Sequence, residues 1–419
     1  MKRKFAILLS AMLLTQAVCG CGGAAPSASA STDSTVSKSS EKAVIVTDEQ
    51  DFTHENGITR LAKEIYGDLN VEFFVLSEDT QERETQISSL RVEIMAGGGP
   101  DGYLLSSPTS NMTFNGEGHP ATLFPDVQRT MQAGAFLPLD DYIKESEYLR
   151  SEDHFAPVFD TGKTDEGQVV LPITYYASVF LLDKAQLADP DFTPKTWDEL
   201  VNCEDTAVLK VVRNNFYTWC GAGIPRIADY TTEKTILTEE NLTAQFENLL
   251  AMPASESFDE ETALIQSGSY AQTDEGMAYY AQNKDTVNAL AIPNTEGGVT
   301  AFITSYAAIN RNSPKADEVF RFFELLFSDE AQIDTETVND ARGTLLMLGN
   351  LNSFLTHKNA YLQPELLESV QSRVNAVRFY SVMDYTIYDT ATTLTWEENP
   401  DCAAAAHSVI EALQTRLSE

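Results

Sequence analysis

The feature that most constrains this 419-residue chain is an alternation of short apolar runs with amphipathic stretches, which begins near Lys42. Short apolar runs predict strands, and stretches with a period of 3.6 residues predict helices. The expected elements are a strand over 42–47, a helix over 55–68, a strand over 70–76, a helix over 80–97 and a strand over 100–107. Strands that alternate with helices predict an α/β fold with a parallel sheet.

Three glycines and a proline separate the second of these helices from its strand, in "MAGGGPDGYLL" (95–105). The glycines allow the positive φ values that end a helix, and the proline blocks its continuation. We therefore expect the chain to reverse directly into a buried strand. Ligands of open α/β sheets collect beyond the carboxyl ends of strands, which makes Ser106 and Ser107 candidate ligand contacts.

The N-terminus has the pattern of an export signal. Three basic residues precede an apolar stretch over 5–18, which is too short to span about 30 Å of hydrocarbon. The sequence "VCGC" at its end resembles the lipobox of bacterial lipoproteins, which implies a signal peptide over 1–20 and a lipid anchor on Cys21. Residues 21–42 contain almost no large apolar side chain, so we expect them to form a disordered tether.

Length and charge narrow the class of protein further. The chain beyond the tether exceeds what one hydrophobic core usually supports, so two domains are expected. Removal of the signal takes away three cations and no anions, which changes the net charge from −35 to −38. Such a surface repels phosphate backbones and argues against a nucleic-acid partner. Solubility at a cell surface explains this charge.

The sequence lacks the residue constellations of common enzymes. The five histidines show no metal spacing, no serine elbow occurs, and "GGGP" lacks the lysine and hydroxyl of a phosphate-binding loop. Cys203, Cys220 and Cys402 match no zinc or redox pattern. A disulfide between Cys203 and Cys220 is possible outside the cell, but it is the less favoured alternative because it would leave an odd thiol. We expect no catalysis, no cofactor and no metal.

Later segments suggest where the chain passes between domains. The stretch 167–187 reads as two β runs interrupted at Pro172, and a proline within a β run marks an edge, a bulge or a domain crossing. A second strand-like crossing is expected over 300–310, followed by a helix over 316–332. Thr196 should cap a short helix, with Glu199 as its capping-box partner.

In this order, the segments resemble the extracellular solute-binding proteins, family 1, of ABC importers, whose known ligands are mostly carbohydrates. The matching stretches are "NGITRLAKEI", "IMAGGGPDGYLL", "GAFLPLDDYI", "GQVVLPITYYASVFLLDKAQL", "PKTWDEL", "DEGMAYYAQ", "ALAIPNTEGG" and "SYAAINRNSPKADEVFRFFELLFSDEAQ". They span 42–332, whereas 333–419 match only in helical character. The resemblance implies a periplasmic-binding-protein-like fold, in which two α/β lobes are joined by a hinge with several crossings and hold one solute in a cleft.

The resemblance also implies where the lobes begin and end. Hinge crossings are expected at Pro172–Thr174, at Ile303–Tyr306 and near residue 350. The expected lobes are an N-lobe of 43–172 plus 304–350 and a C-lobe of 173–303 plus 351–419.

Sugar sites combine flat apolar faces with hydrogen-bonding groups, so aromatic residues beside amides and carboxylates are the expected chemistry. The strongest cluster is "RNNFYTWCGAG" (213–223), which resembles the Glu-Pro-Tyr-Phe-Thr-Trp stretch of maltose-type binding proteins. The resemblance places Asn214 at the acidic position and Phe216 at the sugar-stacking tyrosine. Trp219 matches a residue that serves in packing as often as in contact.

Tyrosines near the expected hinge are further candidates. Tyr175 and Tyr176 follow Pro172, and Tyr176 lies where maltose-type proteins carry a hydroxyl-binding glutamate. Tyr306 belongs to the second crossing. We expect the stretch "GMAYYAQN" (276–283) to be a strand, and the strand-end rule then makes Tyr280 and Gln282 face the cleft.

The N-lobe departs from the maltose-type pattern. Leu105, Pro108 and Thr109 stand where those proteins have Trp, Asp and Arg. The first strand ends instead in "TDEQD" (47–51), which makes Asp48 and Gln50 candidates. Carboxylates there bind sugar hydroxyls, neutralise a cation such as a polyamine, or form a solvated acidic loop.

The expected protein is a monomeric, lipid-anchored receptor on the extracytoplasmic face of a bacterial membrane. It captures a sugar or oligosaccharide by lobe closure and delivers it to the transmembrane subunits of an ABC permease. The alternatives are a binding protein for a cationic solute such as a polyamine, and a surface sensor or adhesin without transport.

Overall fold

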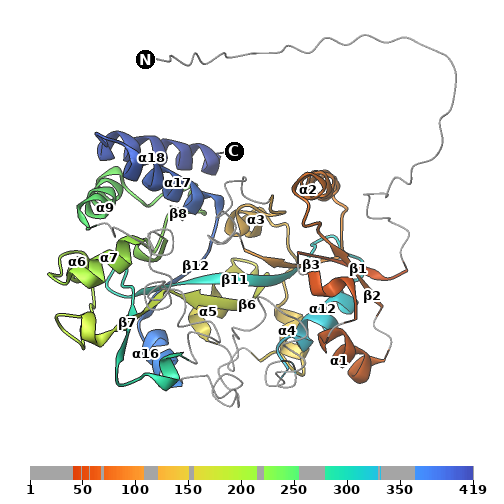
Figure 1. Ribbon diagram of the computed structural model, residues 1–419. Coiled ribbons are helices and arrows are strands. Elements are labelled where there is room, and N and C mark those ends of the chain that lie inside the picture. Colours follow the sequence, from red (N-terminus) through yellow and green to blue (C-terminus); the bar gives the residue numbers. More distant parts are fainter. Residues whose placement is uncertain are drawn as a thin grey trace, which may run out of the picture. The chain divides into compact units, whose positions relative to one another are not determined.

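The computed structural model describes most of the chain beyond Glu41 (Figure 1). The described residues are 41–48, 50–55, 57–67, 70–107, 121–150, 155–214, 221–253, 279–328, 331 and 364–418. The expected signal peptide, Cys21 and nearly all of the tether lie outside this set. Within the set, no helix has both the length and the apolar character that a membrane crossing requires.

A six-stranded sheet is built from strands far apart in the sequence. Its strands are β1 (Ala43–Thr47), β2 (Val71–Val75), β3 (Gly102–Ser106), β6 (Val170–Ala177), β11 (Val299–Ile309) and β12 (Val374–Phe379). The order is β12-β11-β3-β1-β2, and β6 also pairs with β11. β1 is parallel to β2 and β3, whereas β11 is antiparallel to β3 and β6 and parallel to β12. The predicted α/β class is confirmed, although the sheet is mixed.

The predicted alternation over 42–107 is confirmed. Its helical elements are η1 (Gln50–Thr53), α1 (Gly57–Tyr66) and α2 (Thr80–Met95). Gly97 and Gly99 have φ values of 77° and 90°, so the glycine turn ends α2 as expected. A Cβ atom at Gly99 would lie 2.9 Å from the Ile94 side chain, so a larger residue would force that side chain to move.

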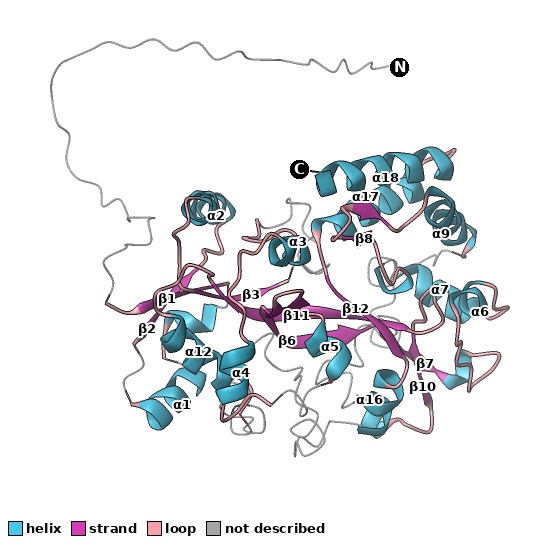
Figure 2. Cartoon of the chain, turned by 180° about the vertical axis from the view of Figure 1, so that it is seen from behind, coloured by secondary structure: helices cyan, strands magenta, loops and turns pink. Residues whose placement is uncertain are grey.

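Further helices cover this sheet or form the second half of the structure. The helices between β3 and β6 are α3 (Val127–Gln132), α4 (Asp140–Glu145) and α5 (Ala156–Asp160), and α12 (Ala316–Leu325) follows β11. The others are η4 (Lys184–Gln186), α6 (Trp197–Val201), α7 (Thr206–Asn214), α9 (Glu239–Ala251), α16 (Pro364–Gln371), α17 (Val382–Trp396) and α18 (Cys402–Ser418). In Figure 2, α9, α17 and α18 lie together, and they contact one another.

Three pairs of shorter strands complete the fold. They are the pair β7 (Val179–Asp183) with β10 (Val287–Ala291), the hairpin β4 (Lys163–Thr164) with β5 (Gly167–Gln168), and the hairpin β8 (Ala228–Asp229) with β9 (Lys234–Thr235). All three are antiparallel.

Thr196 caps α6 as predicted, because its hydroxyl accepts the N–H of Glu199 at 3.2 Å. The Glu199 carboxylate bonds instead to the N–H of Lys195 at 2.8 Å, so the predicted capping box is displaced by one residue.

Two predictions about strands are wrong. β6 runs through Pro172 without interruption, and the break before β7 falls at Ser178. The bulge that a proline was expected to mark is present, because the pairing of β6 with β11 shifts register between Ser305 and Tyr306, opposite Pro172. Residues 279–282 are helical rather than a strand, and the strand of that region is β10. Periodicity does not separate strand from helix in so short an apolar run.

The buried residues form separate cores. Two clusters pack on the six-stranded sheet and include α1, α2, α3 and α12. A third large cluster unites α6, α7, α9, α17 and α18. β11 contributes to both sides, since Ile303 packs in the sheet core and its neighbour Phe302 packs in the helical core. The two expected crossings thus pair with each other as β6 and β11, whereas the third, near residue 350, lies outside the described residues.

Candidate functional site

A pocket of about 280 Å³ lies where β12 meets the segment that leads into β8. Small-molecule sites begin at about 300 Å³, so this pocket lies just below that range. Its lining comprises Gln128 of α3, Pro225, Arg226, Ile227, Ala228, Tyr230, and Asn375, Ala376, Val377, Arg378 and Phe379 of β12. Amides, a phenol and apolar side chains therefore share one concave surface.

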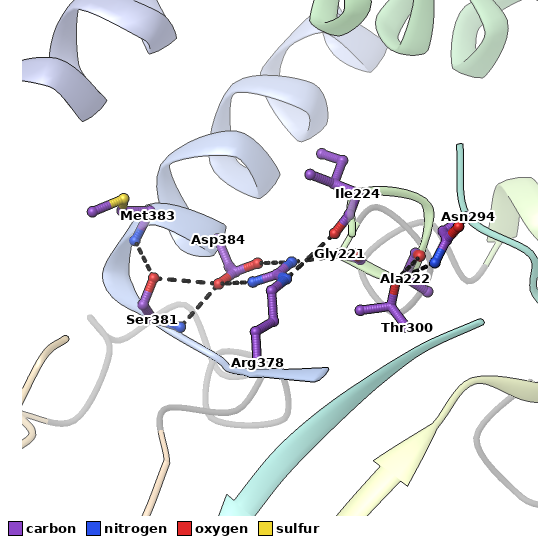
Figure 3. Close-up of polar contacts among 9 residues, drawn as sticks. All are labelled: Gly221, Ala222, Ile224, Asn294, Thr300, Arg378, Ser381, Met383 and Asp384. Carbon is purple, nitrogen blue, oxygen red and sulfur yellow. Dashed lines mark hydrogen bonds and ion pairs between the residues drawn. The ribbon is translucent and has the colours of Figure 1, made fainter. Parts of the chain in front are cut away.

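One wall of the pocket is held in place by Arg378. Its guanidinium contacts both oxygens of Asp384 at 2.7 and 2.8 Å, as Figure 3 shows. It also donates to the carbonyls of Gly221 and Ile224 at 3.2 and 3.3 Å. Burial disfavours the charge of Arg378, but the facing carboxylate of Asp384 outweighs this effect and raises the pKa of the guanidinium. The segment before Pro225 is thereby tied to β12 and α17.

A second, partly buried network holds the exposed pocket residue Asn375 in place. Its side-chain oxygen accepts from the amide of Asn294 at 2.7 Å, and the same amide lies 3.1 Å from the Thr300 hydroxyl. Thr300 in turn donates to the carbonyl of Ala222 at 2.8 Å (Figure 3). Because the buried Asn294 and Thr300 satisfy each other and Asn294 also donates to Asn375, these bonds hold the pocket wall in one arrangement.

Two of the candidates at the strand ends, Asp48 and Ser106, lie together. The carboxylate of Asp48, after β1, accepts the N–H of Ser106 at 3.0 Å and lies 3.5 Å from Arg83 of α2. Burial raises the pKa of Asp48, against the opposing effects of Ser106 and Arg83. Asp48 is thus held in the interior and is not part of a solvated acidic loop.

The other two candidates at this edge have separate contacts. The Ser107 hydroxyl is buried and has no hydrogen-bond partner within the described residues, while its N–H donates to the Thr304 carbonyl at 2.7 Å. Gln50 donates to the Leu76 carbonyl at 2.8 Å.

The hinge tyrosines lie in packed surroundings. Tyr175 is buried, its hydroxyl accepts from Gln371 of α16 at 2.6 Å, and burial raises its pKa to about 12. Tyr306 is 1% exposed and packs edge-on against Phe379, with ring centroids 5.6 Å apart. Since Phe379 lines the pocket, Tyr306 lies one layer beneath it. The side chain of Tyr176 is outside the described residues.

Tyr280 and Gln282 do not line the pocket. Tyr280 is partly buried against the core around β7 and β10, and Gln282 is exposed. Their helical turn removes the strand-end argument that pointed them at a cleft. Phe216, Trp219 and the side chain of Asn214 lie outside the described residues.

Sequence reasoning missed the residues that line the pocket. Arg378 had a visible signal, because an arginine inside the apolar strand "VNAVRF" needs a buried partner. Tyr230 and Gln128 gave no comparable signal. Within the described part of the chain, no three His, Cys, Asp or Glu side chains are placed to hold a metal ion.

A family model described as bacterial extracellular solute-binding protein matches residues 53–333. No curated protein sequence gives a significant match.

Several solved structures are similar over nearly their whole length. An extracellular solute-binding protein family 1 from Alicyclobacillus acidocaldarius is 11% identical, with a TM-score of 0.57 over 92% of this chain and 100% of that one. The sugar-binding protein MalE of Xanthomonas citri is 11% identical, with a TM-score of 0.60 over 90% and 97%. A periplasmic oligogalacturonide-binding protein of Yersinia enterocolitica is 12% identical, with a TM-score of 0.55 over 89% and 98%. These likenesses establish the two-lobed periplasmic-binding-protein fold.

Proposed function

This chain belongs to the bacterial extracellular solute-binding protein family, and we propose on that premise that it captures a sugar or oligosaccharide and delivers it to an ABC importer permease. The observation that carries the proposal is the chemistry of the pocket. Gln128, Tyr230 and Asn375 offer amide and phenol groups for sugar hydroxyls, and Phe379 and Ile227 offer apolar surface for C–H groups.

The same lining favours a sugar over a polyamine. A cationic solute needs carboxylates, and the described lining contains two arginines and neither Asp nor Glu. The names of the similar structures point the same way, since they include a sugar-binding protein and an oligogalacturonide-binding protein. No comparable feature favours a surface sensor or adhesin.

We further propose that Cys21 carries the lipid anchor and that 21–42 tether the folded part to the extracytoplasmic face of the membrane. The lobes are proposed to be 43–172 plus 304–350 and 173–303 plus 351–419. Support comes from β11, whose residues pack in the cores on both sides of this division. Closure of the lobes on the solute would present the loaded protein to the permease.

A thermal-shift screen of the purified mature protein tests the solute class. At a sugar concentration of 100 times Kd, binding should raise the free energy of unfolding by about 2.7 kcal/mol. The panel compares mono- and oligosaccharides with spermidine. A shift with spermidine and none with any saccharide would establish the polyamine alternative, whereas no shift with either would favour the sensor or adhesin.

Phe216 is the sharpest of the proposed contacts. We expect Phe216→Ala to weaken the binding of the sugar found by the screen by about 1 kcal/mol or more, because a stacked aromatic face is lost. Phe216→Tyr keeps that face and should bind as the wild type does. Isothermal titration of the three proteins measures this, and equal affinity in all three would remove Phe216 from the site.

A further inference from the structure

The first turn of α3 and the residues just before it contact both the core of the six-stranded sheet and the helices of the other large core. Val127 packs in the core of the six-stranded sheet. The carbonyl just before the helix, on Pro125, accepts the N–H of Val382 in α17 at 3.1 Å. Arg129 donates to the backbone carbonyl of Arg416 in α18, and Gln128 lines the pocket. This junction is therefore a direct contact between the two lobes, beside the pocket.

Asp126 lies in the middle of this junction. It is 7% exposed, and its Oδ1 atom caps α3 by accepting the N–H of Arg129 at 3.0 Å. Its Oδ2 atom is buried, and the carboxylate also interacts with the hydroxyl of Tyr230. An N-cap needs only one carboxylate oxygen, so capping does not account for the second.

The groups that face Asp126 come from three other elements. Tyr230 reaches it from β8 and its turn, Asp384 from α17, and Arg378 from β12 pairs with Asp384. On its own helix, Arg129 supplies the capping N–H and a positive charge. Arg378 contacts both oxygens of Asp384 and so pairs with that carboxylate. Among Asp126, Asp384 and Arg378, the Asp126 carboxylate is therefore the charge without a buried ion pair.

We propose that protonation of Asp126 controls how firmly the two lobes hold together at this junction, and through that the affinity for solute. Separation of α3 from Tyr230 and α17 would return the carboxylate to water, where its charge is stable. Contact of α3 with Tyr230 and α17 buries the Asp126 carboxylate beside that of Asp384, where the neutral form of Asp126 is favoured. The inference rests on the proposed lobe closure, but its test requires no solute.

The direction of the pH dependence follows from the shift. Burial, with a smaller effect from the nearby Asp384, raises the pKa of Asp126 in the formed junction. This increase outweighs the hydrogen bonds from the Arg129 N–H and the Tyr230 hydroxyl and the charge of Arg129, which lower the pKa. In the separated state its pKa returns to the ordinary value of about 3.9. The stabilisation of the closed junction by protonated Asp126 is thus fully present at pH values below the ordinary pKa. It is lost as the pH rises through the raised pKa of the formed junction. One coupled proton changes the closure equilibrium by at most about tenfold per pH unit.

Asp126→Asn removes the charge and retains the cap, since Asn caps helices as well as Asp does. The matched control is Asp79→Asn, because Asp79 is an exposed N-cap that accepts the N–H groups of Gln81 and Glu82 at the start of α2. Each variant removes one negative charge, so general effects of net charge cancel. Asp126→Ser is a second neutral cap, should Asp126→Asn fold poorly.

The measurements use the solute-free mature protein between pH 4.5 and 8. Small-angle scattering gives the radius of gyration, and amide exchange, corrected for its intrinsic pH dependence, reports on Val382, whose N–H bonds across the junction. Wild type and Asp79→Asn should expand and lose Val382 protection as pH rises, whereas Asp126→Asn should stay compact and protected. If Asp126→Asn and Asp79→Asn behave alike at every pH, Asp126 is only a helix cap. That result would leave the sugar proposal untouched.

Discussion

Replacement of Arg378 by methionine is expected to lower the free energy of unfolding by about 3–5 kcal/mol. The methionine would leave Asp384, which is 4% exposed, as a buried charge without its ion pair. The carbonyls of Gly221 and Ile224 would also lose their donor, which removes the anchor of the pocket wall. Equilibrium unfolding in urea, monitored by fluorescence and circular dichroism, measures the loss.

Arg226→Met is the matched control, because both arginines line the pocket and both pair with a carboxylate. The Arg226 side chain is 58% exposed and its partner Glu296 is 42% exposed. An exposed ion pair contributes only about 0–1 kcal/mol, since water and salt screen it. Equal losses in the two variants would show that burial of the Arg378 pair does not stabilise this wall.

Local sequence patterns predicted the part of the fold that local physics determines. The alternation over 42–107 and the end of α2 at Gly97 need only periodicity and backbone sterics. The interruption expected at Pro172 was wrong, because β6 continues through the proline, whereas the bulge that the proline indicated is present as a register shift against β11. The strand expected over 276–283 was wrong at the described residues 279–282, where helix and strand patterns coincide.

In the candidate site, too, the sequence predicted the residues at strand ends but not the tertiary contacts. Asp48 and Ser106 were each predicted as candidates at the carboxyl end of a strand, and the two strands bring them together in a hydrogen bond. The wall of the pocket was not predicted, because Arg378 meets Gly221 only through tertiary contact between segments 157 residues apart. Sequence periodicity shows that an arginine is buried in a strand, but it does not show which carbonyls will accept its hydrogen bonds.

Phe302→Ala is expected to cost about 3–5 kcal/mol of unfolding free energy. The ring is 0% exposed and packs in the helical core against Tyr380, with ring centroids 5.9 Å apart. It also lies 4.7 Å beneath the guanidinium of Arg378. Alanine would leave a cavity between β11 and Gly221, whose missing side chain brings the backbone close to this ring. Urea unfolding again measures the loss.

Trp396→Ala is the control for Phe302→Ala, since it deletes a larger aromatic side chain that is 83% exposed and should change stability by no more than about 0.5 kcal/mol. If both variants lose the same amount, the loss does not come from the core. The double variant of Phe302→Ala with Arg378→Met then tests their contact. Because the ring supports the guanidinium, the two losses should depart from additivity by at least about 0.5 kcal/mol. Strict additivity would mean that the ring and the ion pair stabilise β11 and β12 independently.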